Sequence, residues 1–319
     1  MFGQPKMRKI PLNINAKKKI IYAIVIVILV TVALISGRLR TKQEKSMLDS
    51  GADFQIHVID VGQGDSIAVI ADGHAMLVDA GLTESGSTVS RYLEKLGVTK
   101  LDYAVASHFH SDHIGGFPTV LEKFPVDTIL EPNCADDLLP TSEVFVHYLD
   151  AVEASGAAYR TAEAGEVFTL GGAQVEVLAP AEAIGENLNN DSIVLRITYG
   201  DTSAILTGDM EHEEEQWLLE QGRELKSDFL KVAHHGSANG SGEEFLAAVQ
   251  PEFVAISCGN GNEYGHPAQE TLDRLKAHTN QIYVTMKCSS IAFLYEADTK
   301  RKYILNWNQV KVSDDEIQR

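Results

Sequence analysis

The chain has 319 residues and a formal net charge of −18. Residues 1–50 carry ten Lys and Arg against two Asp and Glu, which leaves 17 basic and 43 acidic side chains, a balance of −26, for residues 51–319. A domain this acidic repels polyanions unless bound metals reverse the local field, which argues against non-specific nucleic-acid binding over its whole surface. The three cysteines form no Cys-x-x-Cys pair, so neither a zinc ribbon nor a disulfide framework follows from them.

Residues 1–19 are basic and contain two prolines, and we interpret them as a cytoplasmic leader. The next stretch is uncharged and would measure about 24 Å as a helix, short for a bilayer but workable if flanking lysines reach the interface. We therefore predict a transmembrane signal anchor over residues 20–36 and a polar linker over 37–52. A cleaved signal peptide and a buried core helix are the alternatives. The excess of basic residues before the span predicts a single-pass protein of the cell membrane whose large domain is extracellular.

Residues 53–319 are predicted to form one α/β domain, because short apolar runs alternate with helical patterns. It opens with strands at 54–60, 67–70 and 76–78, a helix at 87–96 and a buried strand at 101–106. The later pattern predicts helices near 116–123, 142–154, 211–221, 242–249 and 268–278, strands at 126–130, 157–161, 166–170, 174–178, 193–198, 203–206, 229–233 and 253–257, and three closing strands.

The strand at 101–106 leads directly into His108-Phe109-His110-Ser111-Asp112-His113. Four potential metal ligands lie within these six residues, and each is of a type that binds a borderline divalent ion. A loop at the end of a strand can wrap around an ion and present ligands from both sides of the turn. This segment therefore predicts a metal site.

Histidine or aspartate also stands just past the end of other predicted strands, at Asp60, Asp79, Asp209, His234 and His235. Residues at equivalent ends of neighbouring strands converge on one rim of a sheet, so these side chains can meet although they are far apart in the sequence. The pattern predicts a site for two metal ions.

These motifs resemble the metallo-β-lactamase superfamily over residues 54 to about 285. The resemblance is carried by the histidine segment, Leu77-Val78-Asp79-Ala80-Gly81, Leu206-Thr207-Gly208-Asp209 and the later His234-His235-Gly236. More narrowly, three segments resemble the extracellular domain of ComEC-type competence proteins of DNA uptake: Asp60-Val61-Gly62-Gln63-Gly64-Asp65-Ser66, Asn189-Asn190-Asp191-Ser192 and Val232-Ala233-His234-His235-Gly236-Ser237. The resemblance implies a four-layer αβ/βα sandwich and, for that domain, a nuclease.

The resemblance also implies roles for single residues. His108 and His110 would bind the first metal, Asp112 and His113 the second, and Asp209 would bridge the two. His235 fits the last ligand position because it directly precedes Gly236, which leaves His234 as a neighbour that touches substrate. We expect Asp79, Asp60 and Asn190 to support the ligands from outside, and Asp112 to take part in catalysis as well. His266 either contacts phosphate, acts as an acid or is a structural loop histidine.

One position departs from the superfamily, which usually supplies a third histidine to the first metal shortly before the strand that begins here near residue 192. This chain has Leu188-Asn189-Asn190-Asp191 instead. The first site is then weaker, completed by asparagine or water, or empty until substrate binds. We predict two divalent ions, with zinc as the main metal and manganese able to occupy the first site.

Two adjacent cations lower the pKa of a bridging water and stabilise charge on the attacked centre and the leaving oxygen. The sequence therefore predicts a membrane-anchored, dinuclear metallohydrolase of phosphodiesters, with DNA as a candidate substrate and no inferable protein partner. A hydrolase of a small ester, such as a phosphocholine-type diester or a lactone, and a degenerate metal-binding module are the alternatives.

Overall fold

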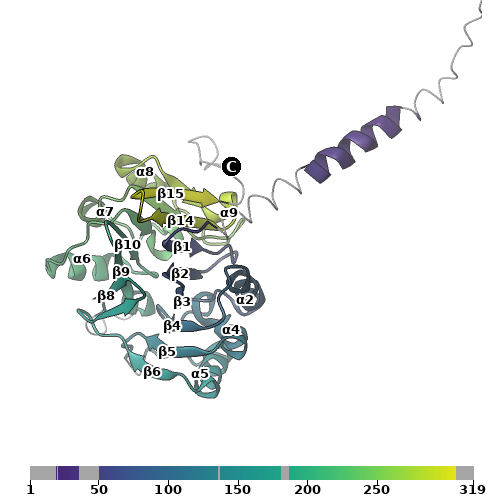
Figure 1. The fold of residues 1–319 in the computed structure, drawn as a ribbon. Coiled ribbons are helices and arrows are strands. Elements are labelled where there is room, and N and C mark those ends of the chain that lie inside the picture. Colours follow the sequence, from purple (N-terminus) through teal and green to yellow (C-terminus); the bar gives the residue numbers. More distant parts are fainter. Residues whose placement is uncertain (1–18, 20, 36–49, 136, 181–186, 307–319) are drawn as a thin grey trace, which may run out of the picture. The chain divides into compact units, whose positions relative to one another are not determined.

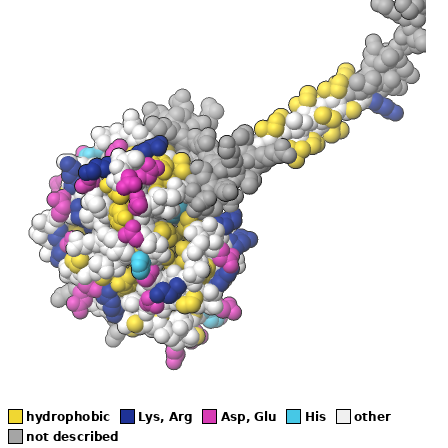
Figure 2. Space-filling view, in the orientation of Figure 1, with side chains coloured by type: hydrophobic (Ala, Val, Ile, Leu, Met, Phe, Trp, Pro, Cys, Tyr) yellow, Lys and Arg dark blue, Asp and Glu magenta, His cyan; other side chains and the backbone are white. Residues whose placement is uncertain are grey.

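The computed structural model describes residues 19, 21–35, 50–135, 137–180 and 187–306. The chain divides into two units, Met1–Ser46 and Met47–Arg319. In the first unit, residues 21–35 form a helix with exposed aliphatic side chains, coloured yellow in Figure 2.

Within the described part of the chain, no helix has both the length and the apolar character needed to cross a membrane. The transmembrane anchor predicted over residues 20–36 is therefore not supported by the structure. The predicted leader and most of the predicted linker lie outside the described residues. The extracellular position of the large domain depends on this anchor and stays a prediction.

The unit Met47–Arg319 is built on two β-sheets (Figure 1). The first has eight strands in the order β15 (Arg301–Asn306), β14 (Ile291–Glu296), β1 (Phe54–Val58), β2 (Ile67–Ala71), β3 (His74–Val78), β4 (Leu101–Val105), β5 (Val126–Glu131) and β6 (Ala158–Thr161). The second has seven, in the order β13 (Ile282–Val284), β12 (Phe253–Ile256), β11 (Phe229–Lys231), β10 (Thr202–Leu206), β9 (Val194–Tyr199), β8 (Ala173–Ala179) and β7 (Val167–Leu170).

Helices cover the outer face of each sheet. On the eight-stranded sheet these are α2 (Gly86–Lys95), α4 (Phe117–Lys123) and α5 (Glu143–Ser155), whose apolar faces form one core cluster with that sheet. On the seven-stranded sheet they are α6 (His212–Glu220), α7 (Glu243–Val249) and α8 (Gln269–His278), which form another. A third cluster joins the inner faces of both sheets. The predicted α/β fold with two sheets and outer helices is therefore confirmed.

The strands read as nearly continuous apolar runs because most are covered on both faces. In β2, Ile67 and Val69 face the core between the sheets, while Ala68 faces the outer helices. Strands β3 to β6 pair in parallel, and helices α2, α4 and α5 supply the crossovers that parallel pairing needs.

Five short turns are not predicted by the sequence pattern, because a single turn is too short to show helical periodicity. They are η1 (Thr83–Ser85), α3 (Ser111–Ile114), η2 (Leu188–Asp191), η3 (Ala233–Gly236) and α9 (Thr285–Cys288). Three of them, α3, η2 and η3, carry residues of the predicted metal site.

The ends of β3 and β4 in one sheet lie near the ends of β10 and β11 in the other. Backbone hydrogen bonds join the segments at these ends: Ile193 N, just before β9, donates to Ser107 O, after β4, and His234 N, after β11, donates to Gly208 O, after β10. The chain segments that carry the predicted ligands therefore meet at one edge of the sandwich.

Candidate metal centre

The histidine segment is divided between a loop and a helix. His108 and His110 lie on the loop after β4, whereas Asp112 and His113 lie on the one-turn helix α3, so the prediction of a single loop is wrong. The amide of Ala80 donates to the carbonyl of His113 at 2.7 Å and ties this turn to the end of β3. His108 on the loop and His113 on the turn both direct Nε2 at the carboxylate of Asp209.

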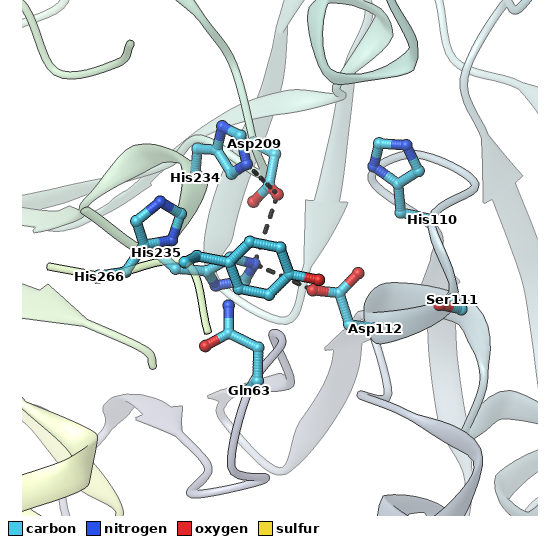
Figure 3. Close-up of a pocket in the computed structure, with 9 residues that line it drawn as sticks. Gln63, His110, Ser111, Asp112, Asp209, His234, His235 and His266 are labelled. Carbon is cyan, nitrogen blue, oxygen red and sulfur yellow. Dashed lines mark ion pairs between the residues drawn. The ribbon is translucent and has the colours of Figure 1, made fainter. Parts of the chain in front are cut away.

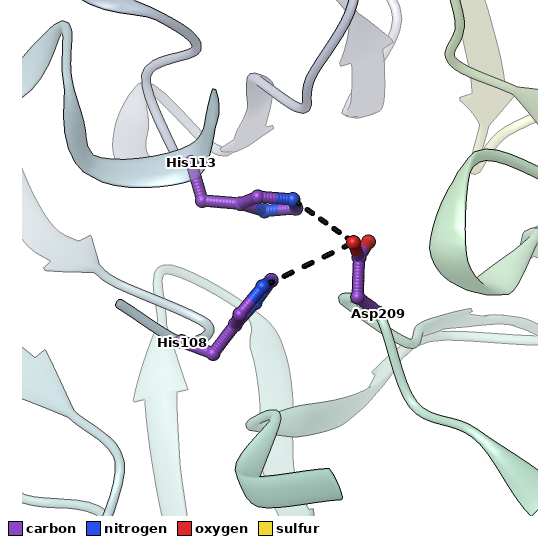
Figure 4. A group of neighbouring side chains, drawn as sticks. All are labelled: His108, His113 and Asp209. Atoms are coloured by element: carbon purple, nitrogen blue, oxygen red, sulfur yellow. Dashed lines mark ion pairs between the residues drawn. The ribbon is translucent and has the colours of Figure 1, made fainter. Parts of the chain in front are cut away.

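Asp209, just after β10, stands at the centre of the cluster. Its Oδ2 lies 3.3 Å from His113 Nε2, 3.4 Å from His235 Nε2, 3.7 Å from His234 Nε2 and 3.9 Å from His108 Nε2. Figure 4 shows two of these imidazoles directed at the carboxylate. One oxygen that faces four ring nitrogens is the arrangement expected of a carboxylate shared by two metal ions.

The remaining distances divide the ligands into two neighbouring groups. His108 Nε2 lies 2.9 Å from His110 Nδ1. On the other side, Asp112 Oδ2 lies 3.3 Å from His235 Nε2. Among the described residues, four sets of three ligand atoms lie within 4.8 Å of one another. Two of them are His108, His113 and Asp209, and Asp112, His113 and His235; the other two contain Asp65.

Asp79 holds His113 from behind. Its Oδ2 lies 2.8 Å from His113 Nδ1, and it also accepts hydrogen bonds from the amide and hydroxyl of Ser107 at 2.8 and 2.7 Å. With Nδ1 occupied in this way, His113 directs Nε2 toward Asp209. A carboxylate behind a ligating imidazole fixes its tautomer and orientation.

A buried ion pair lies behind His235, and sequence reasoning missed it. Lys231 Nζ is 2.7 Å from Asp65 Oδ2, and both side chains are fully buried. Asp65 Oδ1 lies 3.4 Å from His235 Nδ1, which also lies 3.0 Å from the carbonyl of Ser257. The only local signal was the turn Gly62-Gln63-Gly64, which places Asp65 just before a strand.

Burial and charge set the protonation states of the cluster. Burial lowers the pKa of His108 well below its ordinary value, so its imidazole is neutral. Burial acts in the same direction on His113 and His235, but the carboxylate of Asp209 outweighs it and holds both pKa values well above normal. Burial would raise the pKa of Asp209, yet His235 and His113 keep it well below its usual range. The negative charge of Asp209 is therefore compensated by the positive charge of His113 and His235. A divalent cation bound at the same place would compensate it equally well.

The residues present fit such a cation. Among the described residues, the buried Nε2 atoms of His113 and His235 and Oδ1 of Asp209 make no hydrogen bond. Buried polar atoms without partners are costly in a folded protein, and metal coordination is one way to satisfy them. Imidazole and carboxylate are the ligand types that zinc and manganese accept.

A cavity of about 230 Å³ opens onto the cluster, and its lining includes all three side chains predicted to be catalytic, Asp112, His234 and His266. Figure 3 shows the contacts from His234 through Asp209 and His235 to Asp112 along this cavity. Burial, together with His234 and His235, lowers the pKa of His266 to about 4, so it is neutral at pH 7. The lining also includes Gln63 and Tyr264, which sequence reasoning did not select.

Two predicted supporting residues lie elsewhere. The carboxylate of Asp60 accepts from the amide of Gly62 at 3.3 Å, within its own turn, instead of contacting a ligand. Asn190 accepts from the amide of Glu211 and donates to the carboxylate of Glu213, both at 3.1 Å. The structure thus places Asp60 within its own turn, and Asn190 beside Glu211 and Glu213.

We expect Gly64→Ala to disrupt the centre. Gly64 has φ +117°, and a Cβ there would lie 2.2 Å from the carbonyl oxygen of Asp112, so helix α3 would have to move. Metal affinity measured by competition with a chelator should fall at least about tenfold, as for other changes behind metal ligands. Gly73→Ala is the matched control, since it also has positive φ but no atom within 4 Å of the added Cβ. Equal effects of the two substitutions would contradict this account.

Comparison with known proteins agrees with this geometry. A model of the Metallo-beta-lactamase superfamily matches residues 59–259. ComE operon protein 3 of Bacillus subtilis (strain 168) is 32% identical over 260 residues, which cover 76% of this chain and 33% of that protein. Competence protein ComA of Neisseria gonorrhoeae is 32% identical over 240 residues, 75% of this chain and 32% of that protein. The chain spans about a third of the length of these relatives.

Among solved structures, CmlA, a diiron beta-hydroxylase from Streptomyces venezuelae, is similar with a TM-score of 0.53 and 14% sequence identity. The match covers 76% of this chain and 54% of CmlA, and at this identity it shows the fold alone. The predicted resemblance to competence proteins is confirmed, and the matched region 59–259 contains every candidate ligand from His108 to His235. The chain belongs to the metallo-β-lactamase superfamily.

Proposed function

We propose that this protein is a hydrolase of phosphodiester bonds that uses two divalent metal ions, and that its substrate is DNA. The observation that carries the proposal is the position of Asp209 Oδ2, within 3.9 Å of four imidazole nitrogens and beside an open cavity. His108, His110 and Asp209 would hold one ion, and Asp112, His113 and His235, with Asp209, the other. Zinc fits both groups, and manganese fits the first.

Bound there, two cations supply Lewis-acid chemistry, which lowers the pKa of water and stabilises charge on phosphate oxygens. The protein contributes position and charge. The pKa of Asp112 lies below its usual range: burial would raise it, but His235, whose Nε2 lies 3.3 Å from Asp112 Oδ2, and the nearby His113 outweigh burial. A carboxylate this acidic is a weak base, so Asp112 suits metal binding better than proton transfer.

His266 suits a contact with substrate. Its ring lies 5.4 Å from that of His234 at the cavity, and it is neutral at pH 7 because burial lowers its pKa to about 4. A neutral imidazole donates one hydrogen bond to a phosphate oxygen without adding charge. The backbone amide of His266 donates to Asn262 Oδ1 at 2.9 Å, which fixes the loop that carries it.

One consideration favours DNA, and a second sets a condition on how DNA would bind. Proteins named for competence and for recombination are similar to this chain, including Recombination protein 2 of Haemophilus influenzae at 28% identity over 236 residues. Because the domain is acidic, its surface as a whole does not attract a polyanion. Cations bound at the centre would attract it there. Figure 2 shows Lys and Arg interspersed with Asp and Glu on the face in view, with no single sign dominant there.

The test uses the full chain, stripped with chelator and reloaded with zinc or manganese. Substrates are bis-p-nitrophenyl phosphate, single-stranded and duplex oligonucleotides, a phosphocholine diester and a lactone. We expect metal-dependent cleavage of the first three and loss of that cleavage in His113→Ala. Turnover of the lactone alone would refute the phosphodiesterase, and turnover of the phosphocholine diester without oligonucleotide cleavage would refute DNA as substrate.

A further inference from the structure

The first metal group has fewer side chains than the second. His108 and His110 face each other at 2.9 Å, and Asp209 completes a set of three. Zinc in proteins takes four ligands in a structural site, or three protein ligands and a water in a catalytic site. A shared carboxylate is a weak third ligand, so a further nitrogen near Asp209 would complete this site.

The asparagines of η2 do not point to such a ligand; they converge on Glu211. Asn187 Nδ2 donates to Glu211 Oε2 at 2.8 Å, and Asn189 Nδ2 donates to Glu211 Oε1 at 3.1 Å. The backbone amide of Glu211 is held by Asn190 Oδ1 at 3.1 Å. Two amide side chains therefore hold the carboxylate of Glu211 and a third holds its backbone, and the residue is only 9% exposed.

Glu211 in turn holds His234. Glu211 Oε1 lies 3.0 Å from His234 Nδ1, so the carboxylate stands directly behind this ring. Asp79 stands behind His113 in a comparable place, and there the contact is a hydrogen bond. A carboxylate behind an imidazole is the usual environment of a ligating histidine.

The other ring nitrogen, Nε2, is directed at the centre. His234 Nε2 lies 3.7 Å from Asp209 Oδ2, as seen in Figure 3. Two ligands of one zinc ion, each bound at 2.0–2.2 Å in a tetrahedron, lie roughly 3.3–3.5 Å apart, close to the distance found here.

The backbone is shaped for this orientation. His234 has φ 46° and ψ 49°, and His235 has φ 54° and ψ 21°, so two consecutive residues other than glycine are left-handed. In an extended strand, consecutive side chains would point to opposite sides. Here both imidazoles reach the same carboxylate oxygen, at 3.7 and 3.4 Å. Backbone strain of this kind is retained mainly where function requires it.

We infer that His234 is a nitrogen ligand of the first metal through Nε2, positioned by Glu211, which the turn of residues 187–190 holds in place. The inference rests on the proposed two-metal function. It replaces the substrate contact predicted for His234, and it explains how a turn without a histidine still contributes to the first site.

The test is metal content, and it does not depend on activity. Full-length chains are dialysed against buffered free zinc and analysed by elemental mass spectrometry, and cobalt-loaded chains are examined by absorption spectroscopy. Wild type should hold two ions. His234→Ala should lose the first ion, with at least a tenfold fall in its affinity and a changed cobalt spectrum, and Glu211→Gln should weaken the same ion about tenfold. His234→Asn is a second variant, because asparagine tolerates left-handed backbone but cannot reach Asp209.

His266→Ala is the matched control. It removes an imidazole from the same cavity, 5.4 Å from His234, and should keep both ions. If His234→Asn binds two ions with wild-type affinity while its hydrolysis falls, His234 contacts substrate and the inference is wrong. A wild-type chain that holds only one ion overturns it too. Wild type that holds two ions but cleaves no phosphodiester refutes the proposed function and leaves this ligand assignment intact.

Discussion

Asp209→Ala is expected to lose more than about 100-fold in affinity for both metal ions, because removing residues that merely support ligands already costs 10–100-fold. The carboxylate lies within 3.9 Å of four imidazole nitrogens and contributes to both groups of ligands. It also separates two cations that would otherwise repel each other. Isothermal titration with zinc, started from the stripped chain, measures the effect.

Asp209→Asn is the informative companion, since it keeps the shape and removes the charge. We expect it to bind metal more weakly than wild type but better than Asp209→Ala, because the amide oxygen still coordinates. If Asp209→Ala instead keeps two ions with unchanged affinity, the carboxylate does not bridge, and the central place given to it here is wrong.

Lys231→Met is expected to reduce the free energy of unfolding by about 3–5 kcal/mol, the usual cost of breaking a buried ion pair. The substitution leaves the carboxylate of Asp65 fully buried without its cation. Burial raises the pKa of Asp65, and Lys231 followed by His235 outweighs burial and lowers it to about 2, so the side chain is charged at neutral pH. Urea unfolding of the metal-free chain measures the loss apart from metal binding.

Two further variants separate charge from packing. Lys231→Met combined with Asp65→Asn should recover part of the lost stability, because the uncompensated charge is gone. Lys123→Met removes an exposed lysine 2.8 Å from Glu94 and should have a far smaller effect. A Lys231→Met chain as stable as Lys123→Met would show that the buried pair contributes little.

Much of the centre could be predicted from sequence because its ligands are local or follow strand ends. His108, His110, Asp112 and His113 lie within six residues, and Asp209 and His235 follow apolar strands. Strand order then brings these ends to one edge, which a pattern of alternating strands and helices already implies. The pattern of strands and helices predicted an α/β domain, and the resemblance to the superfamily implied its arrangement as a four-layer sandwich.

The missed residues depend on contacts that no local pattern encodes. Asp65 and Lys231 meet only when the two sheets pack together, and Lys231 looks like an ordinary strand residue in the sequence. We predicted that Asp60 supports a ligand, whereas the structure places Asp65 beside His235. The shape of the turn between the two residues explains this difference. Gly62 and Gly64 have φ 78° and 117°, and this turn leaves Asp60 bonded to its own loop while Asp65 faces the centre.

The sequence pattern did not single out Glu211 either, because it is one of several acidic residues at the start of α6. Its importance follows from the amides of Asn187 and Asn189 on one side and the imidazole of His234 on the other. Sequence reasoning identified the absence of histidine at 188–191 but not the carboxylate of Glu211 that lies beside His234.

Anomalous X-ray scattering from crystals grown with zinc tests the central claim most directly. The account predicts two peaks roughly 3.5–4 Å apart, the usual spacing of a two-metal hydrolase site, with the carboxylate of Asp209 between them. A single peak, or two peaks of which neither touches Asp209, would contradict it.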